Sequence, residues 1–130
     1  MNRLPDWQTR LTAALMAKRY TPGNCAEFAA DMCLAMTGVD HAAPFRGRYS
    51  TIKGGYRVLR KAGYADHVDF VQRNFTEKLV IDLVPGDLVV LDGDDGLTVG
   101  VFQGSAGCYV PNGHGVGVVP ITMAIRAFEV

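Results

Sequence analysis

The sequence predicts an α+β domain, with helices in its N-terminal part and a small antiparallel β-sheet in its C-terminal part. Up to about residue 75, apolar residues recur at the spacing of amphipathic helices. From Leu79 onward, short β-branched runs alternate with turns rich in Gly and Asp. Helices first and a strand meander second are typical of this class. We therefore expect a single domain over residues 1–130, helical over about 1–75 and a sheet over about 79–130.

The composition is that of a globular protein. The chain has 130 residues, of which 48% are hydrophobic and 20% charged, and its formal net charge is zero. This length suffices to bury a core, and the neutral balance gives no global electrostatic support for a nucleic-acid partner. No apolar run approaches the ~20 residues of a membrane span, and the first ten residues are too polar for a secretory signal. We expect neither nucleic-acid binding nor membrane insertion.

The first expected helix runs from Leu4 to Arg19. It carries an apolar stripe at helical spacing that begins with Trp7, which we therefore interpret as a core anchor and not as a binding platform. The remaining members of the stripe are Leu11, Ala14 and Leu15. A turn over residues 20–23, which contains Pro and Gly, leads to the next helix.

The segment from Gly23 to Gly38, GNCAEFAADMCLAMTG, is the best-defined helix of the sequence. Asn24 is a suitable N-cap, Glu27 completes a capping-box pattern, and Gly38 lies where a left-handed residue would end the helix. The apolar stripe at helical spacing consists of Cys25, Phe28, Ala29, Met32 and Met36.

Cys25 has two interpretations. A thiol in the first turn of a helix is exposed to the positive end of the helix dipole, which favours the nucleophilic thiolate. Free cysteines are also commonly small buried hydrophobic residues. Cys25 and Cys33 lie about 12 Å apart along one helix, which is too far for a disulfide. With Cys108, the chain has an odd number of cysteines. No zinc-type spacing occurs, and we expect no metal and no cofactor.

Two further helices are expected, over about 51–62 and 66–74, and Asp40 could cap a single helical turn over residues 41–45. The region between Phe45 and Tyr64 has basic residues and no acidic ones. These residues form either a solvated helix side or a contact surface for an acidic partner chain. They are Arg46, Arg48, Lys53, Arg57, Arg60 and Lys61.

Several short strands are expected after Leu79. A turn with the sequence Val-Pro-Gly-Asp precedes the first of them, and Gly-rich turns separate the others. Pro120 to Ala124 is expected to form a helical turn. The expected strands are residues 88–91, 97–103, 108–110, 116–119 and 126–130.

The order of these motifs resembles the NlpC-type cysteine peptidases of the papain-like superfold. The segments that carry the resemblance are GNCAEFAADMCLAMTGVD, FRGRY and PGDLVVL. Their combination is similar to a family of small uncharacterised proteins encoded among phage and gene-transfer-agent tail genes. The resemblance spans Trp7 to Val130 and implies an NlpC-like fold.

The resemblance assigns roles to individual residues. Cys25 matches the nucleophile, and Asp87 matches the structural Asp of the Pro-Gly-Asp-Leu-Val motif. The catalytic histidine of active members opens the next strand, where this chain has Thr98, which cannot act as a base at neutral pH. The polar residue that orients the base is also absent near Pro111. The resemblance therefore implies a hydrolase scaffold with a vestigial site at Cys25, Thr98 and Pro111.

His114 is the residue that could restore activity. It lies in a Gly-rich turn and could reach Cys25 from another direction, although such a turn is a poor support for a base. His41 and His67 lie at expected helix starts, where we interpret them as surface histidines.

Three functions follow as hypotheses. The first is a structural component of a phage or phage-like tail tip or baseplate, which binds other tail-tip or hub proteins and is located in the virion tail after synthesis in the host cytoplasm. The alternative is an active cysteine hydrolase that uses Cys25 and His114 to cut peptide or amide bonds of peptidoglycan during cell entry. A third is a cytosolic thiol protein unrelated to phage.

Overall fold

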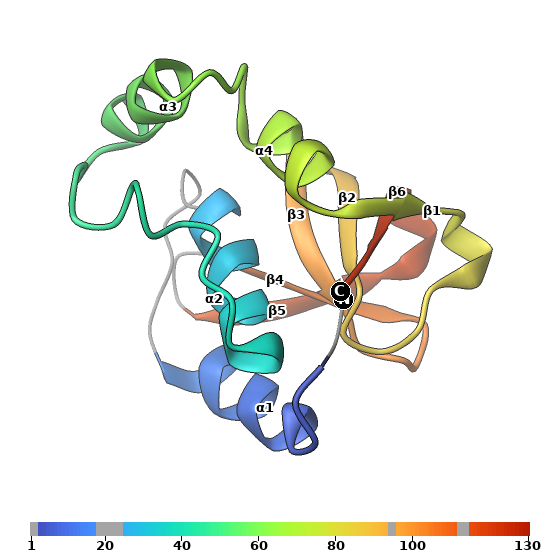
Figure 1. The fold of residues 1–130 in the computed structure, drawn as a ribbon. Helices are drawn as coiled ribbons and strands as arrows, with labels where there is room; N and C mark the ends of the chain where they lie inside the picture. Colours follow the sequence, from blue (N-terminus) through green and yellow to red (C-terminus); the bar gives the residue numbers. More distant parts are fainter. Residues whose placement is uncertain (1–2, 18–24, 94–95, 112–114) are drawn as a thin grey trace.

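The computed structural model describes residues 3–17, 25–93, 96–111 and 115–130, and its elements follow the predicted order of helices before strands (Figure 1). The helices are α1 (Trp7–Ala17), α2 (Cys25–Thr37), α3 (Ile52–Lys61) and α4 (His67–Asn74). The strands are β1 (Thr76–Lys78), β2 (Leu88–Gly93), β3 (Gly96–Phe102), β4 (Gly107–Pro111), β5 (Val116–Pro120) and β6 (Ala124–Glu129). Short 3₁₀ turns are η1 (Val80–Asp82) and η2 (Ile121–Met123).

The strands form one antiparallel sheet in the order β1-β6-β2-β3-β4-β5. Strands β2 to β5 are the expected meander, and β6 returns to lie between β1 and β2. The α+β prediction is therefore confirmed. The sequence analysis missed β1, because a three-residue strand of Thr, Glu and Lys has no apolar alternation to reveal it. None of the helices in the described ranges is long and apolar enough to cross a membrane.

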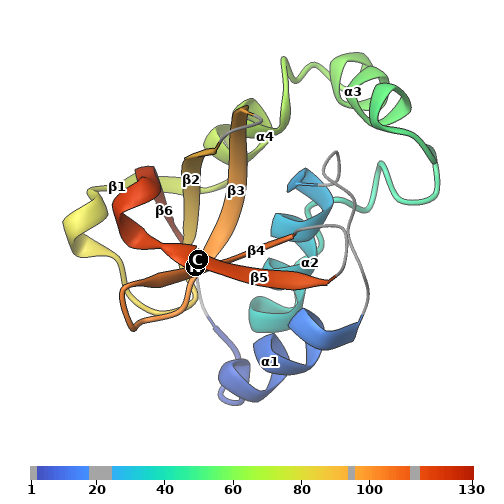
Figure 2. The same cartoon turned by 180° about the vertical axis from the view of Figure 1, so that it is seen from behind.

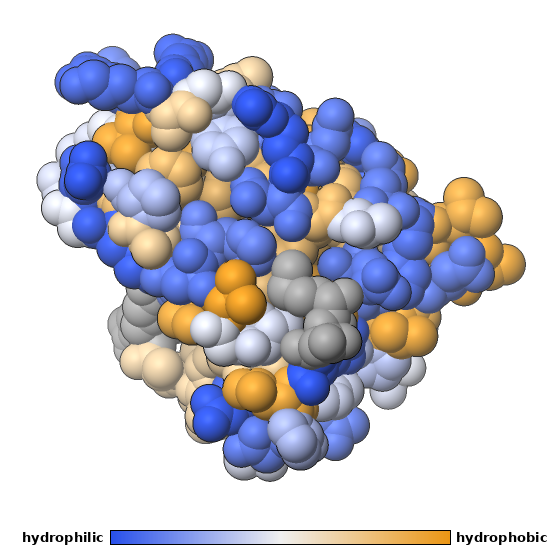
Figure 3. Space-filling view, in the orientation of Figure 1, coloured by the Kyte–Doolittle hydropathy of each residue, from blue (hydrophilic) through white to orange (hydrophobic). Residues whose placement is uncertain are grey.

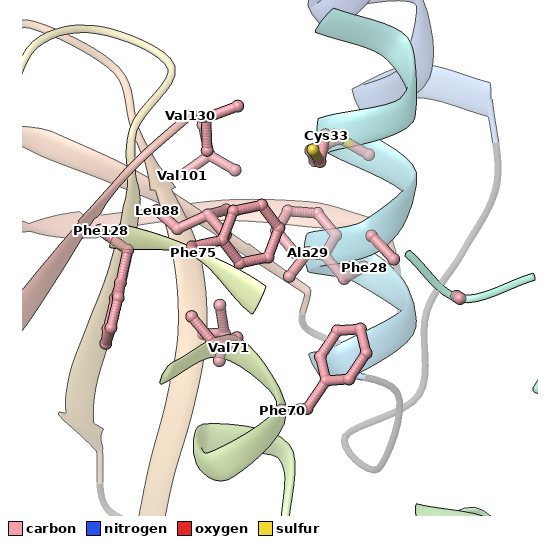
Figure 4. Close-up of a cluster of buried hydrophobic side chains, with 14 of the residues drawn as sticks. Phe28, Ala29, Cys33, Phe70, Val71, Phe75, Leu88, Val101, Phe128 and Val130 are labelled. Atoms are coloured by element: carbon pink, nitrogen blue, oxygen red, sulfur yellow. The ribbon is translucent and has the colours of Figure 1, made fainter. Parts of the chain in front are cut away.

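Helix α2 packs against β3, and α1 lies across α2 on the side away from α4 (Figures 1 and 2). The apolar side chains of α2 and α4 meet those of the sheet in the main core, as the close-up shows (Figure 4). The fully buried members from the helices are Phe28, Ala29, Ala30, Met32, Cys33, Met36, Phe70 and Val71. A second, smaller cluster, centred on Val89, Leu91, Cys108 and Val110, also contains residues of β2 and β4.

The helix ends follow the predicted local chemistry. Gly38 adopts a left-handed φ of 81° and donates its backbone N–H to the Leu34 carbonyl, which ends α2. Thr51 and Asp66 cap α3 and α4, because their side-chain oxygens accept backbone N–H groups of the first turns. Residues 41–47 form hydrogen-bonded turns: Asp40 accepts the Ala42 N–H, and the Arg46 N–H donates to the Ala42 carbonyl, in agreement with the single helical turn expected there. Asn24 and Gly23, the predicted start of α2, lie outside the described residues.

Asp87 is the buried polar residue on which these elements converge. Its carboxylate accepts hydrogen bonds from Arg3 at 2.9 Å and Lys78 at 2.7 Å. It also accepts the backbone N–H groups of Val84 at 3.0 Å and Val130 at 3.2 Å. The Arg3 guanidinium also donates to the Val130 carbonyl, so the described ends of the chain lie side by side at this carboxylate. The structural role that the resemblance implies for Asp87 has its physical basis in these contacts.

The turn before Asp87 requires glycine. Gly86 has a φ of 94°, and a Cβ atom there would lie 2.7 Å from the Arg3 guanidinium and 2.9 Å from the Trp7 ring. Arg3 in turn lies over Trp7, 4.4 Å from the ring centroid. Trp7 is half-buried against the main core, in agreement with its interpretation as an anchor.

Replacement of Asp87 by alanine is expected to lower the free energy of unfolding by about 3–5 kcal/mol, because it leaves two cations and two backbone donors without their acceptor. Urea denaturation monitored by circular dichroism measures this loss. Asp82→Ala, at an exposed position five residues earlier, serves as control and is expected to stay within about 0.5 kcal/mol of the wild type. Equal losses in the two variants would contradict the role of the Asp87 network.

Candidate functional site

Cys25 is the first residue of α2. The backbone there lies at the positive end of the helix dipole, where a thiolate is favoured. Its side chain lies outside the described residues, so the structure does not place the sulfur. The next residues, Ala26 and Glu27, are half-buried, and Ala26 packs against the main core.

Thr98 lies in β3, directly opposite Leu91 of β2. Side chains of directly opposed residues share a face of the sheet, and Leu91 belongs to the smaller cluster. Gly100, which lies on the same face two residues later, confirms this assignment, since a Cβ atom there would meet Leu91 at 3.0 Å. The intervening Val99 belongs to the main core with α2.

Pro111 ends β4, opposite Val116 of β5. The antiparallel register of β3 and β4, which pairs Val101 with Tyr109, brings Pro111 opposite Val99 when continued toward the start of β3. Thr98 and Pro111 therefore lie at the same end of the two strands, but their side chains are on opposite faces of the sheet. His114, the residue proposed to restore activity, lies outside the described residues.

His67 lies closer to β3 than the sequence analysis indicated. Its Nε2 atom is 2.8 Å from the backbone carbonyl oxygen of Leu97, the residue before Thr98. Because a carbonyl oxygen only accepts, Nε2 is the donor in this bond, and a neutral ring would carry its acceptor at Nδ1. The interpretation of His67 as a plain surface histidine is thus incomplete, because it joins the first turn of α4 to the start of β3.

His41 is also more enclosed than expected. Its ring lies 4.8 Å from that of Phe75, measured between centroids, and its Nε2 atom is buried without a hydrogen-bond partner in the described part of the chain. No local pattern indicated this enclosure, because His41 follows a turn residue, Asp40, in a segment without periodicity. The contact depends on how residues 38–45 fold back over α4 and β1.

A group of charged side chains surrounds the first two turns of α2. The Arg46 guanidinium contacts Asp40 at 2.9 Å, Asp31 at 2.6 Å and Glu27 at 3.8 Å. Tyr49 donates its hydroxyl to Glu27 at 2.7 Å. The hydrogen bond from Arg46 lowers the pKa of Asp40, and the same bond raises the pKa of Arg46. Burial, followed by the bond to Glu27, raises the pKa of Tyr49.

This arrangement changes the interpretation of the predicted basic surface. Arg46 is engaged by carboxylates and does not extend toward solvent with the other five residues. The other five residues of the predicted partner surface are exposed, and all of them except Arg48 lie in α3. They are Arg48, Lys53, Arg57, Arg60 and Lys61.

A pocket lies between the first turn of α2 and α3. Its polar wall is formed by Glu27, Arg46 and Tyr49. It has about 20 Å³ open to the centre of a water molecule, which is room for roughly one water. The apolar wall consists of Ala26, Ala42, Phe45, Gly55, Val58, Leu59 and Phe70. Ala26, the residue after Cys25, is among the residues that line this pocket.

The other two thiols are chemically protected. Cys33 and Cys108 are both fully buried, and they lie in the two different core clusters. Burial raises the pKa of Cys33, and it raises the pKa of Cys108 to about 11. Neither thiol is therefore expected to react at neutral pH in the folded protein. Within the described ranges, no group of three His, Cys, Asp or Glu residues is arranged to hold a metal ion.

The fold is similar to that of NlpC/p60 domains. A solved structure, the NlpC/p60 domain of the peptidoglycan hydrolase SagA, matches 95% of this chain and 96% of its own with a TM-score of 0.54. The sequence identity is 15%, so the likeness establishes the fold alone. The chain belongs to the family described as Domain of unknown function (DUF6950), whose profile matches residues 2–130. No curated protein matches the sequence.

Asp40→Asn is expected to cost about 1 kcal/mol at neutral pH, because it removes the charge that Arg46 holds and the site is partly screened by solvent. Since the folded state lowers the pKa of Asp40, its contribution is present above the ordinary value of 3.8 and disappears as the pH falls through the lowered value. Urea denaturation at neutral pH and at successively lower pH measures this difference.

Asp6→Asn is the matched control, because Asp6 pairs with Arg10 in an exposed position on α1. It is expected to change stability by less than about 0.5 kcal/mol at neutral pH. A deficit of Asp40→Asn that persists unchanged well below pH 3.8 would contradict the assigned ion pair.

Proposed function

We propose that this protein is a structural component of a phage or phage-like tail tip or baseplate, built on an NlpC-like fold that has lost its catalytic base. In this role it contacts neighbouring tail proteins and is located in the virion tail after synthesis in the host cytoplasm. The fold-level likeness to a hydrolase domain supplies the scaffold, and the tail role comes from the resemblance of the motifs to proteins encoded among tail genes.

The observation that carries the proposal is the position of Thr98. By the resemblance, Thr98 matches the catalytic histidine of active NlpC members. In the structure it is the third residue of β3 and lies opposite Leu91, on the face away from Val99 and α2, so a side chain at this position does not face the start of α2. Threonine cannot accept the thiol proton at neutral pH. Pro111 cannot orient a base either, because its side chain has no hydrogen-bonding group. Cys25 would therefore lack both partners that NlpC chemistry needs.

The surface supports an assembly role. The exposed basic residues around α3 offer a contact area for an acidic partner chain. Val118 on the edge strand β5 is 58% exposed, and that strand has no charged side chain. Such an edge is able to accept a strand from another chain.

The alternative function is an active cysteine hydrolase that cleaves peptidoglycan peptide or amide bonds. The observation in its favour is that α2 begins at Cys25, so the dipole and the backbone N–H groups of the first turn would favour a thiolate and hold an oxyanion. Its base would be His114. His67 is a further imidazole to test, because it reaches the start of β3.

Alkylation with iodoacetamide separates the two functions. The assembly role predicts that Cys25 in the folded protein reacts slowly at neutral pH, at a rate unchanged by His114→Ala or His67→Ala. Peptide mapping by mass spectrometry assigns the label to each thiol. Cys33 and Cys108 provide an internal background, because both are buried and expected to react only after denaturation.

Fast alkylation of Cys25 with a low apparent pKa, which is slowed by either histidine substitution, would instead support the hydrolase. Cys25→Ala is the control that removes the label at this position. All three thiols must react in denaturant, so that an absent label reports protection and not a failed reaction.

The tail role itself is tested by the composition of purified particles. Mass spectrometry of particles from a producing host is expected to detect this chain, together with tail proteins, at a fixed ratio to them. Deletion of its gene is expected to give particles with defective tails, and a gene carrying Cys25→Ala is expected to restore them. Absence of the chain from intact particles would contradict the tail role.

A further inference from the structure

The loop over residues 79–84, between β1 and β2, is an exposed apolar projection. Leu79 is 68% exposed, Ile81 is 88% exposed and Val84 is 47% exposed. The space-filling view shows apolar surface protruding at the side of the molecule where Figure 1 places this loop (Figure 3). Single exposed apolar residues are ordinary, but three of them within six residues make this loop a candidate for an interaction surface. We call residues 79–84 the apolar loop.

The apolar loop is held rigidly at its base. Lys78 precedes it and Val84 ends it, and both donate to the same Oδ2 atom of Asp87, at 2.7 Å and 3.0 Å. Inside the loop, η1 is closed by a hydrogen bond from the Asp82 N–H to the Leu79 carbonyl at 2.9 Å. A loop fixed in this way loses little conformational entropy on binding, which favours a role as an anchor.

A hollow of complementary character lies beside α3. Figure 1 places α3 at the opposite side of the fold from the apolar loop. Its apolar surface comes from Pro44, Phe45, Val58 and Ala62, and Arg48 and Lys61 supply positive charge. About 380 Å³ of it is open to the centre of a water molecule, so it is large enough for aliphatic side chains. We call this feature the α3 hollow.

We propose that the chain self-associates head to tail, with the apolar loop of one copy bound in the α3 hollow of the next. Ile81 and Leu79 cover the apolar surface of the hollow, and the exposed Asp82 lies against Arg48 and Lys61. Because the two surfaces lie at different ends of one molecule, each added copy leaves a loop and a hollow open, and the product is a ring or a filament.

The charges on the two surfaces favour a second copy of this chain, bound head to tail, as the occupant of the α3 hollow. A two-fold contact of loop with loop would bring Asp82 toward its own symmetry mate, and a contact of hollow with hollow would oppose Arg48 and Lys61 to themselves. The head-to-tail contact instead pairs opposite charges. The biological role of this contact rests on the proposed function in a tail. The contact itself is tested by the oligomeric state of the purified protein, which depends neither on catalysis nor on tails.

The test uses two variants, each blocked at one end. Ile81→Asp disables the apolar loop, and Arg48→Glu with Lys61→Glu disables the α3 hollow. Sedimentation velocity of the wild type is expected to show mass that rises with concentration beyond two copies and falls at high salt. Each blocked variant alone is expected to be a monomer, with association weakened roughly tenfold or more.

Met16→Gln, at an 82% exposed position on α1, is the control and is expected to associate like the wild type.

Mixing the two blocked variants is the decisive step. Each retains the surface that the other has lost, so a mixture is expected to form a one-to-one heterodimer and nothing larger. Circular dichroism verifies that all variants are folded. The inference would be overturned if the wild type stays monomeric or forms only dimers. It would also be overturned if the mixture of the two variants stays monomeric. If the purified chain is strictly monomeric but is still found in tails, the inference of self-association fails and the proposed function is retained.

Discussion

Asp87 accepts hydrogen bonds from four groups that belong to separate parts of the chain: Arg3 before α1, Lys78 in β1, Val84 before β2 and Val130 after β6. A fully buried carboxylate is costly unless its charge is matched, so these parts of the chain must come together for the fold to be stable. The same carboxylate fixes the entrance to β2, the two described ends of the chain and the base of the apolar loop.

The interactions that hold the fold are separate from those that catalysis would need. The main core joins α2 to β3 through residues such as Phe28, Met32 and Val101, and none of these side chains takes part in proton transfer. Thr98 lies on the other face of β3, opposite Leu91, so its side chain is not part of the main core that holds α2. A scaffold of this kind can lose its base and remain folded, which makes reuse in an assembly physically reasonable.

The sequence predicted those features that local chemistry determines. The apolar period located α2, and Gly38 indicated its end, because both depend on residues within a few positions of one another. It missed β1 and the position of β6 between β1 and β2, because strand neighbours depend on long-range pairing. The engagement of Arg46 by Asp31 and Glu27 was missed for the same reason, since its own segment contains no acidic residue.

The candidate site was predictable only in part. Helical spacing and turn residues place Cys25 at the start of α2, and the resemblance assigns Thr98 to β3. The contact between His67 and the Leu97 carbonyl requires the packing of α4 beside β3, which no local pattern encodes. The roles of Cys25 and His114 remain predictions, because the sulfur and the imidazole lie outside the described residues.

Turnover of purified muropeptides by the wild-type protein and by Cys25→Ala tests the central claim most directly. The proposed function, in which the Cys25 thiol has no base, predicts that the wild type releases no more product than Cys25→Ala, while an active NlpC/p60 hydrolase domain digests the same substrate in parallel. Hydrolysis by the wild type that disappears in Cys25→Ala would contradict the account and establish an enzyme.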